Sequence, residues 1–365
     1  MMLYSLLKPL LFRLDAEHAH ELVTGLLHVA HTIPPLARTI RALYTYTDPI
    51  LATTYAGLRF MNPVGLAAGF DKRAALLGPM TLLGFGHIEV GTVTPRPQQG
   101  NQRPRLFRLS EDRALINRLG FNSPGASAVA RRIRDDRTGR IYPARTVVVG
   151  VNIGKNRTTP LERAAEDYLA AFVALAPFVD YVAINISSPN TPGLRRLHER
   201  GALEVLLGTL VAVNRKLDRP RPLFLKVSPD ETPAQLEAVV RAGCDTGIAG
   251  FIATNTTLSR EGLRSPLAGE SGGLSGRPLA ALAQDVTAQI YSLVGGRLPV
   301  IGVGGIASAE DAYARIRAGA VLVQLYTGLI YEGPGLVRAI NRGLAQLLRR
   351  DGYMSVADAV GADQH

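Results

Sequence analysis

Two lysines stand in segments that are otherwise apolar or rich in glycine. Lys72 ends the run Ala-Gly-Phe-Asp-Lys72, and Lys226 ends the run Leu-Phe-Leu-Lys226. A lysine among such residues is costly to bury unless an anion compensates its charge. These segments offer few acids besides Asp71. We therefore expect the two lysines to meet an anionic ligand or an electron-rich cofactor.

The other polar side chains of comparable segments are mostly neutral amides. A single asparagine is usually a turn residue, so only the set carries an argument. An amide offers a donor beside an acceptor, which suits the edge of a planar heterocycle, whereas a metal would need more carboxylates or histidines. We predict no metal site and interpret His28 and His31 as packing or hydrogen-bonded residues. The amides are Asn117, Asn152, Asn185, Asn190 and Asn255.

Ser187-Ser188-Pro189 adds a candidate reactive hydroxyl. No histidine and aspartate lie nearby in the sequence, so a hydrolytic serine would lack its base. The alternative is an ordinary Ser-Pro turn.

The run Gly302-Val-Gly304-Gly305-Ile-Ala307 matches a dinucleotide-binding pattern. That pattern requires an acid about 20 residues further on, and Tyr326 occupies this neighbourhood instead. We expect a phosphate cradle formed by Gly304, Gly305, Tyr326 and Thr327, with tight turns as the alternative.

The elements that must position these residues are short β-branched runs alternating with helical patterns. This alternation favours a (β/α)₈ TIM barrel over an open sheet. In such a barrel the chemistry lies at the carboxyl ends of the strands, where the polar residues above occur. The predicted strands are Val64 to Ala68, His87 to Gly91, Thr146 to Val151, Tyr181 to Ile186, Leu223 to Val227, Gly250 to Thr254, Pro299 to Val303 and Val321 to Leu325.

The barrel is predicted to span residues 49–350, followed by a flexible tail at 351–365. Residues 1–48 form a small N-terminal helical extension of two apolar helices, Met1 to Leu14 and Ala16 to His31, with Asp15 as a cap. Helices this apolar must be covered, either by packing on the barrel or by a membrane surface.

Composition narrows the remaining classes. The 365 residues carry 41 Lys and Arg against 30 Asp and Glu, a net charge of +11, and Arg96 to Arg145 holds twelve arginines against four acids. With no Trp and 6% aromatics, stacking residues for nucleic acid are scarce, so the charge favours an anionic membrane surface and substrate. A lone Cys244 excludes an internal disulfide and favours a reducing compartment. We find neither a signal peptide nor an apolar run of about 18 residues.

Several long motifs together resemble the quinone-dependent class 2 dihydroorotate dehydrogenase family. They occur in the family's order and cover nearly the whole chain. They are Ala-Gly-Phe-Asp-Lys72, Gly-Thr92-Val-Thr-Pro-Arg-Pro-Gln, Asn117-Arg-Leu-Gly-Phe121-Asn, Gly-Val-Asn152-Ile-Gly-Lys-Asn, Asn-Ile-Ser-Ser188-Pro-Asn-Thr-Pro-Gly, Thr254-Asn255-Thr256-Thr and Gly-Gly-Leu-Ser-Gly276-Arg-Pro-Leu.

The resemblance implies an FMN-dependent oxidoreductase that converts dihydroorotate to orotate in pyrimidine biosynthesis and passes the electrons to a membrane quinone. It also implies one FMN per subunit, a peripheral position at the cytoplasmic face of the bacterial cell membrane, a monomer and no nucleic-acid partner. Phe70 beside Asp71 and Thr327 after Tyr326 are small departures from the family pattern.

The family's site residues transfer by motif. Ser188 matches the catalytic base, and His20 and Arg108 match positions lining a quinone tunnel. FMN would contact Ala68, Gly69, Phe70, Asp71, Lys72, Thr92, Asn152, Asn185, Lys226, Thr254, Gly276, Gly305, Tyr326 and Thr327. The substrate would contact Lys72, Asn117, Arg118, Leu119, Gly120, Phe121, Asn185, Asn190, Asn255 and Thr256.

Two other classes stay open on the residues alone. One is a different phosphate- or FMN-binding barrel, such as a sugar-phosphate lyase or a soluble dihydroorotate or dihydropyrimidine oxidoreductase. The other is a basic membrane- or nucleic-acid-binding protein with a degenerate barrel. Flavin colour separates the dehydrogenase from a lyase or a binding protein, and preference for a quinone over fumarate or NAD⁺ separates it from a soluble oxidoreductase.

Overall fold

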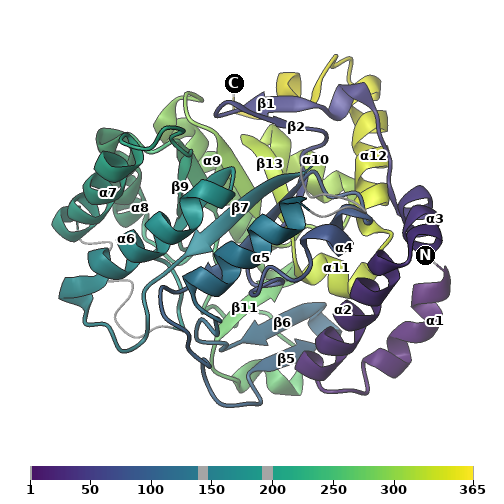
Figure 1. Cartoon of the computed structure of the whole chain (residues 1–365). Coiled ribbons are helices and arrows are strands. Elements are labelled where there is room, and N and C mark those ends of the chain that lie inside the picture. Colours follow the sequence, from purple (N-terminus) through teal and green to yellow (C-terminus); the bar gives the residue numbers. More distant parts are fainter. Residues whose placement is uncertain (1, 139–146, 191–199, 365) are drawn as a thin grey trace.

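A closed barrel of parallel strands forms the centre of the molecule (Figure 1). The computed structural model describes residues 2–138, 147–190 and 200–364. All eight predicted strands are confirmed, although Thr146, the predicted start of the third, lies outside the described residues. In barrel order they are β3 (Val64–Leu66), β4 (His87–Val93), β7 (Val148–Ile153), β8 (Tyr181–Asn185), β9 (Leu223–Lys226), β10 (Gly250–Ala253), β12 (Val300–Val303) and β13 (Ala320–Leu325), which pairs with β3.

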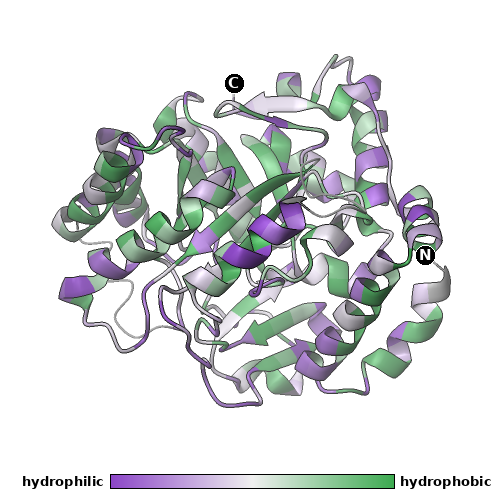
Figure 2. Cartoon of the chain, in the orientation of Figure 1, coloured by the Kyte–Doolittle hydropathy of each residue, from purple (hydrophilic) through white to green (hydrophobic). Residues whose placement is uncertain are grey.

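The strands are apolar because both of their faces are buried. All residues of β4, β7 and β13 are buried, as expected for parallel strands enclosed by helices. Figure 2 shows much of β7 as hydrophobic and the outer helix α5 as largely hydrophilic. The covering helices are α4 (Leu77–Thr81), α5 (Ala126–Thr138), α6 (Ala164–Leu175), α7 (Arg200–Asn214), α8 (Pro233–Thr246), α9 (Ala280–Val294), α10 (Ala309–Arg317), α11 (Thr327–Glu332) and α12 (Leu336–Arg350).

Local signals in the sequence set the ends of these helices. Thr232 and Gln235 form a capping box at the start of α8, and Pro233 occupies its first turn. Gly247 ends the same helix with φ of +81°, a conformation that glycine adopts without strain. The Ser308 hydroxyl accepts the amide of Asp311 at 3.1 Å at the start of α10. Thr232 and Ser308 therefore cap the N-termini of α8 and α10.

A β-hairpin closes the amino end of the barrel. Strands β1 (Thr53–Tyr55) and β2 (Leu58–Phe60) pair antiparallel outside the barrel wall, at the top of Figure 1. Beneath them His87 is fully buried, with its ring edge-to-face with Phe60 at 5.6 Å between centroids. Burial lowers the pKa of His87 to about 3, so this end of the barrel holds a neutral, packed ring.

A three-stranded antiparallel sheet covers the carboxyl end of the barrel, and the sequence did not predict it. It consists of β5 (Leu106–Leu109), β6 (Ala114–Asn117) and β11 (Gly273–Gly276), at the bottom of Figure 1. β6 is the central strand and pairs with both others. The sheet brings two distant loops together over the strand ends, where the sequence places the chemistry.

The N-terminal extension contains three helices, which corrects the predicted pair. They are α1 (Met2–Leu11), α2 (Ala16–Thr32) and α3 (Pro34–Tyr44). The predicted Asp15 cap is confirmed, because its carboxylate accepts two amides of α2. Pro34 and Pro35 begin α3 and do not merely end α2, since a helix tolerates proline in its first turn. No helix among the described residues is both long and apolar enough to cross a bilayer.

The predicted flexible tail at 351–365 is instead packed where the structure describes it. Val356 and Ala359 are fully buried, and the amide of Gly361 donates to the carbonyl of Ile316 at 3.1 Å. Residues after α12 therefore belong to the barrel body.

The basic stretch Arg96 to Arg145 lies partly outside the described residues. Within the described part, Arg103 and Arg105 pair with Glu17 of α2, and Arg103 also reaches Glu21. Part of the local charge thus fastens the N-terminal helices to the barrel.

Candidate active site

One cavity at the carboxyl ends of the barrel strands gathers most of the predicted site residues. Nineteen of them line it: Ala68, Gly69, Lys72, Thr92, Asn117, Leu119, Gly120, Phe121, Asn185, Ser188, Asn190, Lys226, Thr254, Asn255, Thr256, Gly276, Gly305, Tyr326 and Thr327. Leu115 of β6 and Ser275 of β11 also line the cavity, so the antiparallel sheet forms part of its wall. The sequence did not single out either residue.

Lys72 stands in the cavity wall beside a partner that the sequence did not single out. Its Nζ donates to Asn122 Oδ1 at 2.6 Å. Burial lowers the pKa of Lys72 to about 7, and the charge of Arg105 lowers it further while Glu17 opposes the shift. Asn122 is the last residue of the Asn117-Arg-Leu-Gly-Phe121-Asn motif, and its place there was the available signal. The amine can change its charge near neutral pH, and an anionic ligand would favour the charged form.

Lys226 lies on the cavity floor above a buried carboxylate. Burial lowers the pKa of Lys226, and the charge of Glu89 opposes this shift. Glu89 is fully buried inside the barrel and accepts hydrogen bonds from Asn152 Nδ2 at 2.9 Å and from Tyr181 OH at 3.0 Å. Gln324 donates a third at 2.9 Å. The sequence offered one signal for Glu89, an acid between the apolar residues Ile88 and Val90 of a predicted strand.

A chain of amide hydrogen bonds fixes the polar floor of the cavity. Thr92 Oγ1 donates to Asn152 Oδ1 at 2.6 Å, and Asn185 Nδ2 donates to the same oxygen at 3.1 Å. Asn255 Nδ2 then donates to Asn185 Oδ1 at 3.2 Å. Because Glu89 accepts from the amide nitrogen of Asn152, the orientation of every amide in the chain is set. Asn152 lies below the cavity and acts on it through Asn185 and Thr92.

The two adjacent serines have different surroundings. Ser187 is bound within the amide chain, where Asn255 Nδ2 donates to its hydroxyl at 3.1 Å. Ser188 lines the cavity, is buried, and accepts the amide of Asn190 at 3.3 Å. No histidine or carboxylate among the described residues makes a hydrogen bond to Ser188. The hypothesis of a hydrolytic serine therefore finds no general base among these residues.

Three other residues predicted to contact ligand lie outside the cavity lining. Asp71 directs its carboxylate to the backbone amides of Arg73, Ala75 and Leu76, and so holds the loop after β3. Arg118 forms an ion pair with Glu270. Phe70 is buried behind the lining, edge-to-face with Tyr326 at 5.5 Å between centroids. Asp71 and Arg118 thus support the loops around the cavity without lining it, and their contacts with a ligand stay predictions.

The two predicted tunnel residues also lie outside the cavity lining, and they have different surroundings. His20 of α2 packs edge-to-face on Phe70 at 4.7 Å, so a row of rings runs from α2 through Phe70 to Tyr326 in the cavity wall. Burial lowers the pKa of His20, which keeps its ring neutral. Arg108 of β5 stacks over Phe12 at 4.8 Å and donates to the carbonyl of Leu11 at 3.0 Å. Arg108 thus contacts the end of α1.

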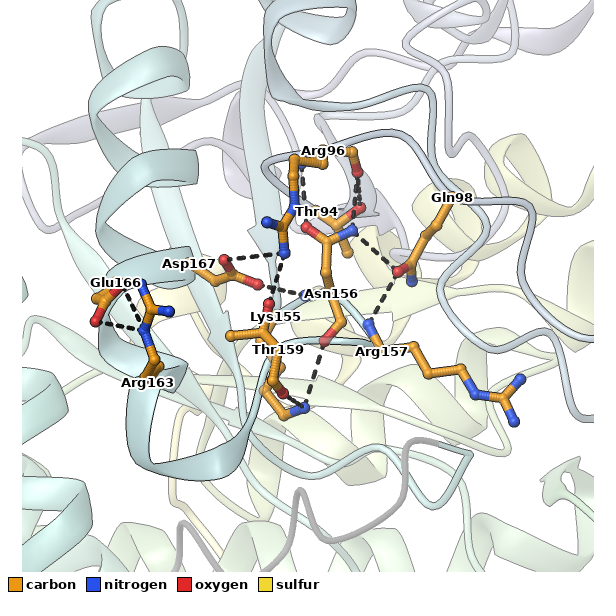
Figure 3. A network of polar contacts seen from close by, with 10 residues as sticks. All are labelled: Thr94, Arg96, Gln98, Lys155, Asn156, Arg157, Thr159, Arg163, Glu166 and Asp167. Carbon is orange, nitrogen blue, oxygen red and sulfur yellow. Dashed lines mark hydrogen bonds and ion pairs between the residues drawn. The ribbon is translucent and has the colours of Figure 1, made fainter.

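A polar network fixes the loops that follow β4 and β7 (Figure 3). Asn156 is its centre: its amide donates to Asp167 Oδ2 at 2.8 Å, and its side chain donates to the carbonyl of Arg96 at 3.0 Å. Arg96 in turn donates to Thr159 Oγ1 at 2.8 Å. The loop that begins at Thr94 is therefore anchored to its neighbour along the rim.

The glycine-rich end of the cavity joins three loops. Gly276, Gly304 and Gly305 have φ of +102°, +115° and +77°, which favour glycine. A Cβ on Gly305 would lie 2.3 Å from Ala280 Cα, so only glycine permits this approach of the loop to α9. Thr327 closes this end, with its hydroxyl 2.9 Å from that of Ser275. The pattern expected for a phosphate cradle is thus brought together in space.

Comparison with known proteins gives a consistent result. Residues 50–348 match the family described as dihydroorotate dehydrogenase. The chain is 67% identical to "Dihydroorotate dehydrogenase (quinone)" of Roseiflexus sp. (strain RS-1), over 98% of each chain. It is 52% identical to the protein of the same name from Anaeromyxobacter sp. (strain Fw109-5), over 99% of this chain and 98% of the other. The crystal structure of DHODH in complex with ferulenol from Eimeria tenella is similar, with TM-score 0.86, 38% identity and 96% of each chain covered.

Proposed function

This chain belongs to the dihydroorotate dehydrogenase family, and from that premise we propose that it oxidises dihydroorotate to orotate with FMN as the bound hydride acceptor and a membrane quinone as the final acceptor. The observation that carries the proposal is the cavity itself. It combines Lys72 and Lys226 with oriented amides and a glycine-rich end. The product of the reaction, orotate, is used in pyrimidine biosynthesis.

The cavity fits a flavin mononucleotide in its donor chemistry. Lys226 offers a charged donor to the polar edge of a flavin ring, beside Thr92 and Asn185, whose own protons are engaged in the amide chain. Gly305 and Thr327 stand at the end suited to a phosphate. Lys226 lines the floor beside the amide chain, with Glu89 below as its counter-charge. When bound, FMN supplies the ring that accepts the hydride from the substrate carbon bearing the carboxylate.

The remaining amides fit the substrate. Asn117, Asn190 and Asn255 can pair with the alternating N–H and C=O groups of a dihydropyrimidine ring, and Lys72 can pair with its carboxylate. Asn190 Nδ2 already donates to the backbone carbonyl of Asn117 at 3.0 Å and to Asn117 Oδ1 at 3.3 Å, so these two side chains are held in a fixed arrangement. Fixing the ring in this way is the positional part of the catalysis.

Ser188 is the group we assign to remove the proton from the neighbouring ring carbon. A free serine is a poor base, so the site must exclude water and stabilise the charge that develops on Oγ. Its burial supplies the first condition, and the Asn190 amide that donates to Oγ supplies part of the second. Lys226 would balance the negative charge that arrives with the hydride.

The quinone half of the reaction is assigned to the N-terminal helices. Leu6, Leu10 and Leu26 of α1 and α2 are 74%, 59% and 63% exposed, an apolar surface suited to lipid. His20 of α2 packs on Phe70, and Phe70 packs on Tyr326 in the cavity wall, so a row of rings leads from this helix to the cavity. We therefore propose peripheral attachment at the cytoplasmic face of the cell membrane. One chain supplies every residue that the proposal uses, so a monomer is sufficient.

Flavin chemistry tests the proposal directly. Purified full-length protein should be yellow, release FMN on denaturation, and lose its visible absorbance when dihydroorotate is added without oxygen. Ubiquinone or menaquinone analogues should reoxidise it faster than fumarate or NAD⁺. A colourless protein that cannot be loaded with FMN contradicts the proposal, and a preference for fumarate or NAD⁺ favours a soluble type of dihydropyrimidine oxidoreductase.

A further inference from the structure

Arg315 is a buried arginine behind the glycine-rich end of the cavity. It belongs to α10 and is 2% exposed. Its side chain runs along β12 so closely that a Cβ on Gly302 would lie 2.5 Å from Arg315 Cγ. The helix therefore sends a guanidinium beneath the loop that follows β12.

The guanidinium binds two backbone segments that meet at this end. Arg315 Nη2 donates to the carbonyl of Gly304 at 3.0 Å and to the carbonyl of Ala280 at 3.0 Å. Gly304 lines the cavity, and Ala280 is the residue against which Gly305 packs. Arg315 thus joins the loop after β12 to the start of α9.

The positive charge of Arg315 has no paired carboxylate among the described residues. Burial lowers the pKa of Arg315 to about 10, so the group stays charged at neutral pH. The negative charges of Asp311 and Asp285 raise the pKa of Arg315 and so oppose the effect of burial. Asp311 is already engaged by Arg277 at 2.9 Å and by the amide of Ala307 at 2.9 Å. Nε and Nη1 of Arg315 are buried without a hydrogen-bond acceptor within the described part of the chain.

An uncompensated buried cation is costly, and an anion nearby would offset that cost. The glycine-rich end of the cavity, on the other side of the Gly304 backbone, is where the proposed function places the FMN phosphate. We propose that Arg315 is a positioning residue for that phosphate: it holds the Gly304 loop against α9 and balances the charge of the phosphate from behind the backbone. This inference rests on the proposed function, because it requires FMN as the ligand.

A purely structural role makes a different prediction. If Arg315 only stabilised the barrel as a whole, with no effect on the phosphate end, its loss would weaken the binding of any flavin equally. If its charge acts on the phosphate, its loss should weaken FMN and spare riboflavin, which has the same ring but no phosphate. The ratio of the two affinities therefore separates the roles.

The experiment uses the full-length protein and three variants. Dissociation constants for FMN and for riboflavin are measured by flavin fluorescence in Arg315→Gln, Arg315→Lys and Arg317→Gln. Arg317 is the matched control, because it lies on the same helix, is more exposed, and pairs with Asp363. We expect Arg315→Gln to weaken FMN by about tenfold or more and riboflavin by less than about twofold. Arg317→Gln should change neither.

Arg315→Lys keeps the charge and tests the inference even if Arg315→Gln does not fold. Its preference for FMN over riboflavin should be close to that of the natural protein at low pH and should fall as pH rises, because a buried lysine loses its proton more readily than an arginine. Equal losses of FMN and riboflavin in Arg315→Gln, or a preference in Arg315→Lys that does not change with pH, would overturn the inference. If the natural protein itself bound no FMN, the proposed function would fail, which is a separate result.

Discussion

The cavity and the N-terminal helices both depart from the usual distribution of polar and apolar side chains, but in opposite ways. In the cavity, lysines, amides and a serine are buried, whereas on α1 and α2 large leucines are exposed. Folded proteins usually do the reverse, so each region fits a partner of its own polarity. A polar, planar ligand suits the first region and an apolar surface suits the second. The two regions are linked by the rings of His20, Phe70 and Tyr326.

This comparison implies two separable half-reactions. Changes in the cavity should impair reduction of the protein by dihydroorotate, and changes in α1 or α2 should impair only its reoxidation by quinone. Each prediction below would either sharpen that division or break it.

Ser188→Ala should have the largest effect, because it removes the proposed base. We expect anaerobic flavin reduction by dihydroorotate to slow by about 10²-fold or more, with FMN content and quinone reoxidation unchanged. Stopped-flow absorbance measures both half-reactions. Ser187→Ala is the matched control, since its hydroxyl is bound within the amide chain and should affect reduction less. Equal slowing in both variants would remove the base assignment.

The pH dependence of product binding should report Lys72. Its pKa, lowered to about 7 by burial, leaves it partly neutral at physiological pH, and an anion binds the charged form. The affinity for orotate should therefore be highest below pH 7 and fall by up to about tenfold per pH unit above it. Perturbation of the flavin spectrum measures the dissociation constant. Lys72→Met should bind orotate weakly at every pH, and a pH slope that survived in it would assign the titration elsewhere.

Charges placed on the exposed leucines should affect only the membrane half. Leu6→Glu combined with Leu26→Glu should reduce co-sedimentation with anionic lipid vesicles and quinone turnover by about tenfold, because each carboxylate must leave water to enter the lipid surface. Reduction by dihydroorotate should not change. Val205→Glu is the control, since Val205 is 66% exposed on α7, across the barrel from α1 and α2 (Figure 1). Equal loss in the control would show a nonspecific charge effect.

His20→Ala should have a moderate effect, confined to reoxidation. It removes the first ring of the row that leads from α2 to the cavity, so we expect the quinone KM to rise by a few-fold while flavin reduction stays constant. Double-mixing stopped-flow with a soluble quinone analogue separates these steps. A slower reduction by dihydroorotate would mean that His20 serves the cavity, and the division between the regions would fail there.

Most of the barrel could be predicted because its strands carry their own signal. Strands such as β7 (Val148–Ile153) are short, rich in valine and buried on both faces, and the residues that follow them necessarily meet at one rim. The three-stranded sheet could not be found in this way, because β6 and β11 are four residues long and find each other across more than 150 residues of chain. Their pairing depends on the barrel, which brings the loops together.

Prediction of the site was limited because the sequence does not show the direction in which each side chain points. Asp71 and Lys72 are adjacent, yet one binds its own loop and the other lines the cavity. Glu89 and Arg315 were missed for a related reason: each is a charge within a regular element, and sequence alone does not show that it points toward the site from below or behind.

The smallest effect on activity should come from the contact that fastens the two regions together. Glu17 of α2 pairs with Arg105, which is 8% exposed and also donates to the carbonyls of Gln99 and Asn101. Burial raises the pKa of Glu17, but the hydrogen bonds and charges of Arg105 and Arg103 outweigh this and bring the pKa below its usual value. A lowered carboxyl pKa stabilises the fold above the unfolded-state pKa of about 4.3, and that stability is lost as pH falls through the lower folded pKa. Glu17→Gln should therefore lower the free energy of unfolding, measured with urea at pH 7, by about 1 to 3 kcal/mol.

The cost of Glu17→Gln should shrink as pH falls, while both half-reactions stay near their normal rates at neutral pH. Arg163→Gln, at an exposed pair with Glu166, is the matched control and should change stability little at either pH. A large loss of quinone turnover in Glu17→Gln would show that the position of α2, and not only its apolar surface, governs reoxidation. In that case the two regions would act as one unit, and the helices could not be treated as an attachment independent of the barrel.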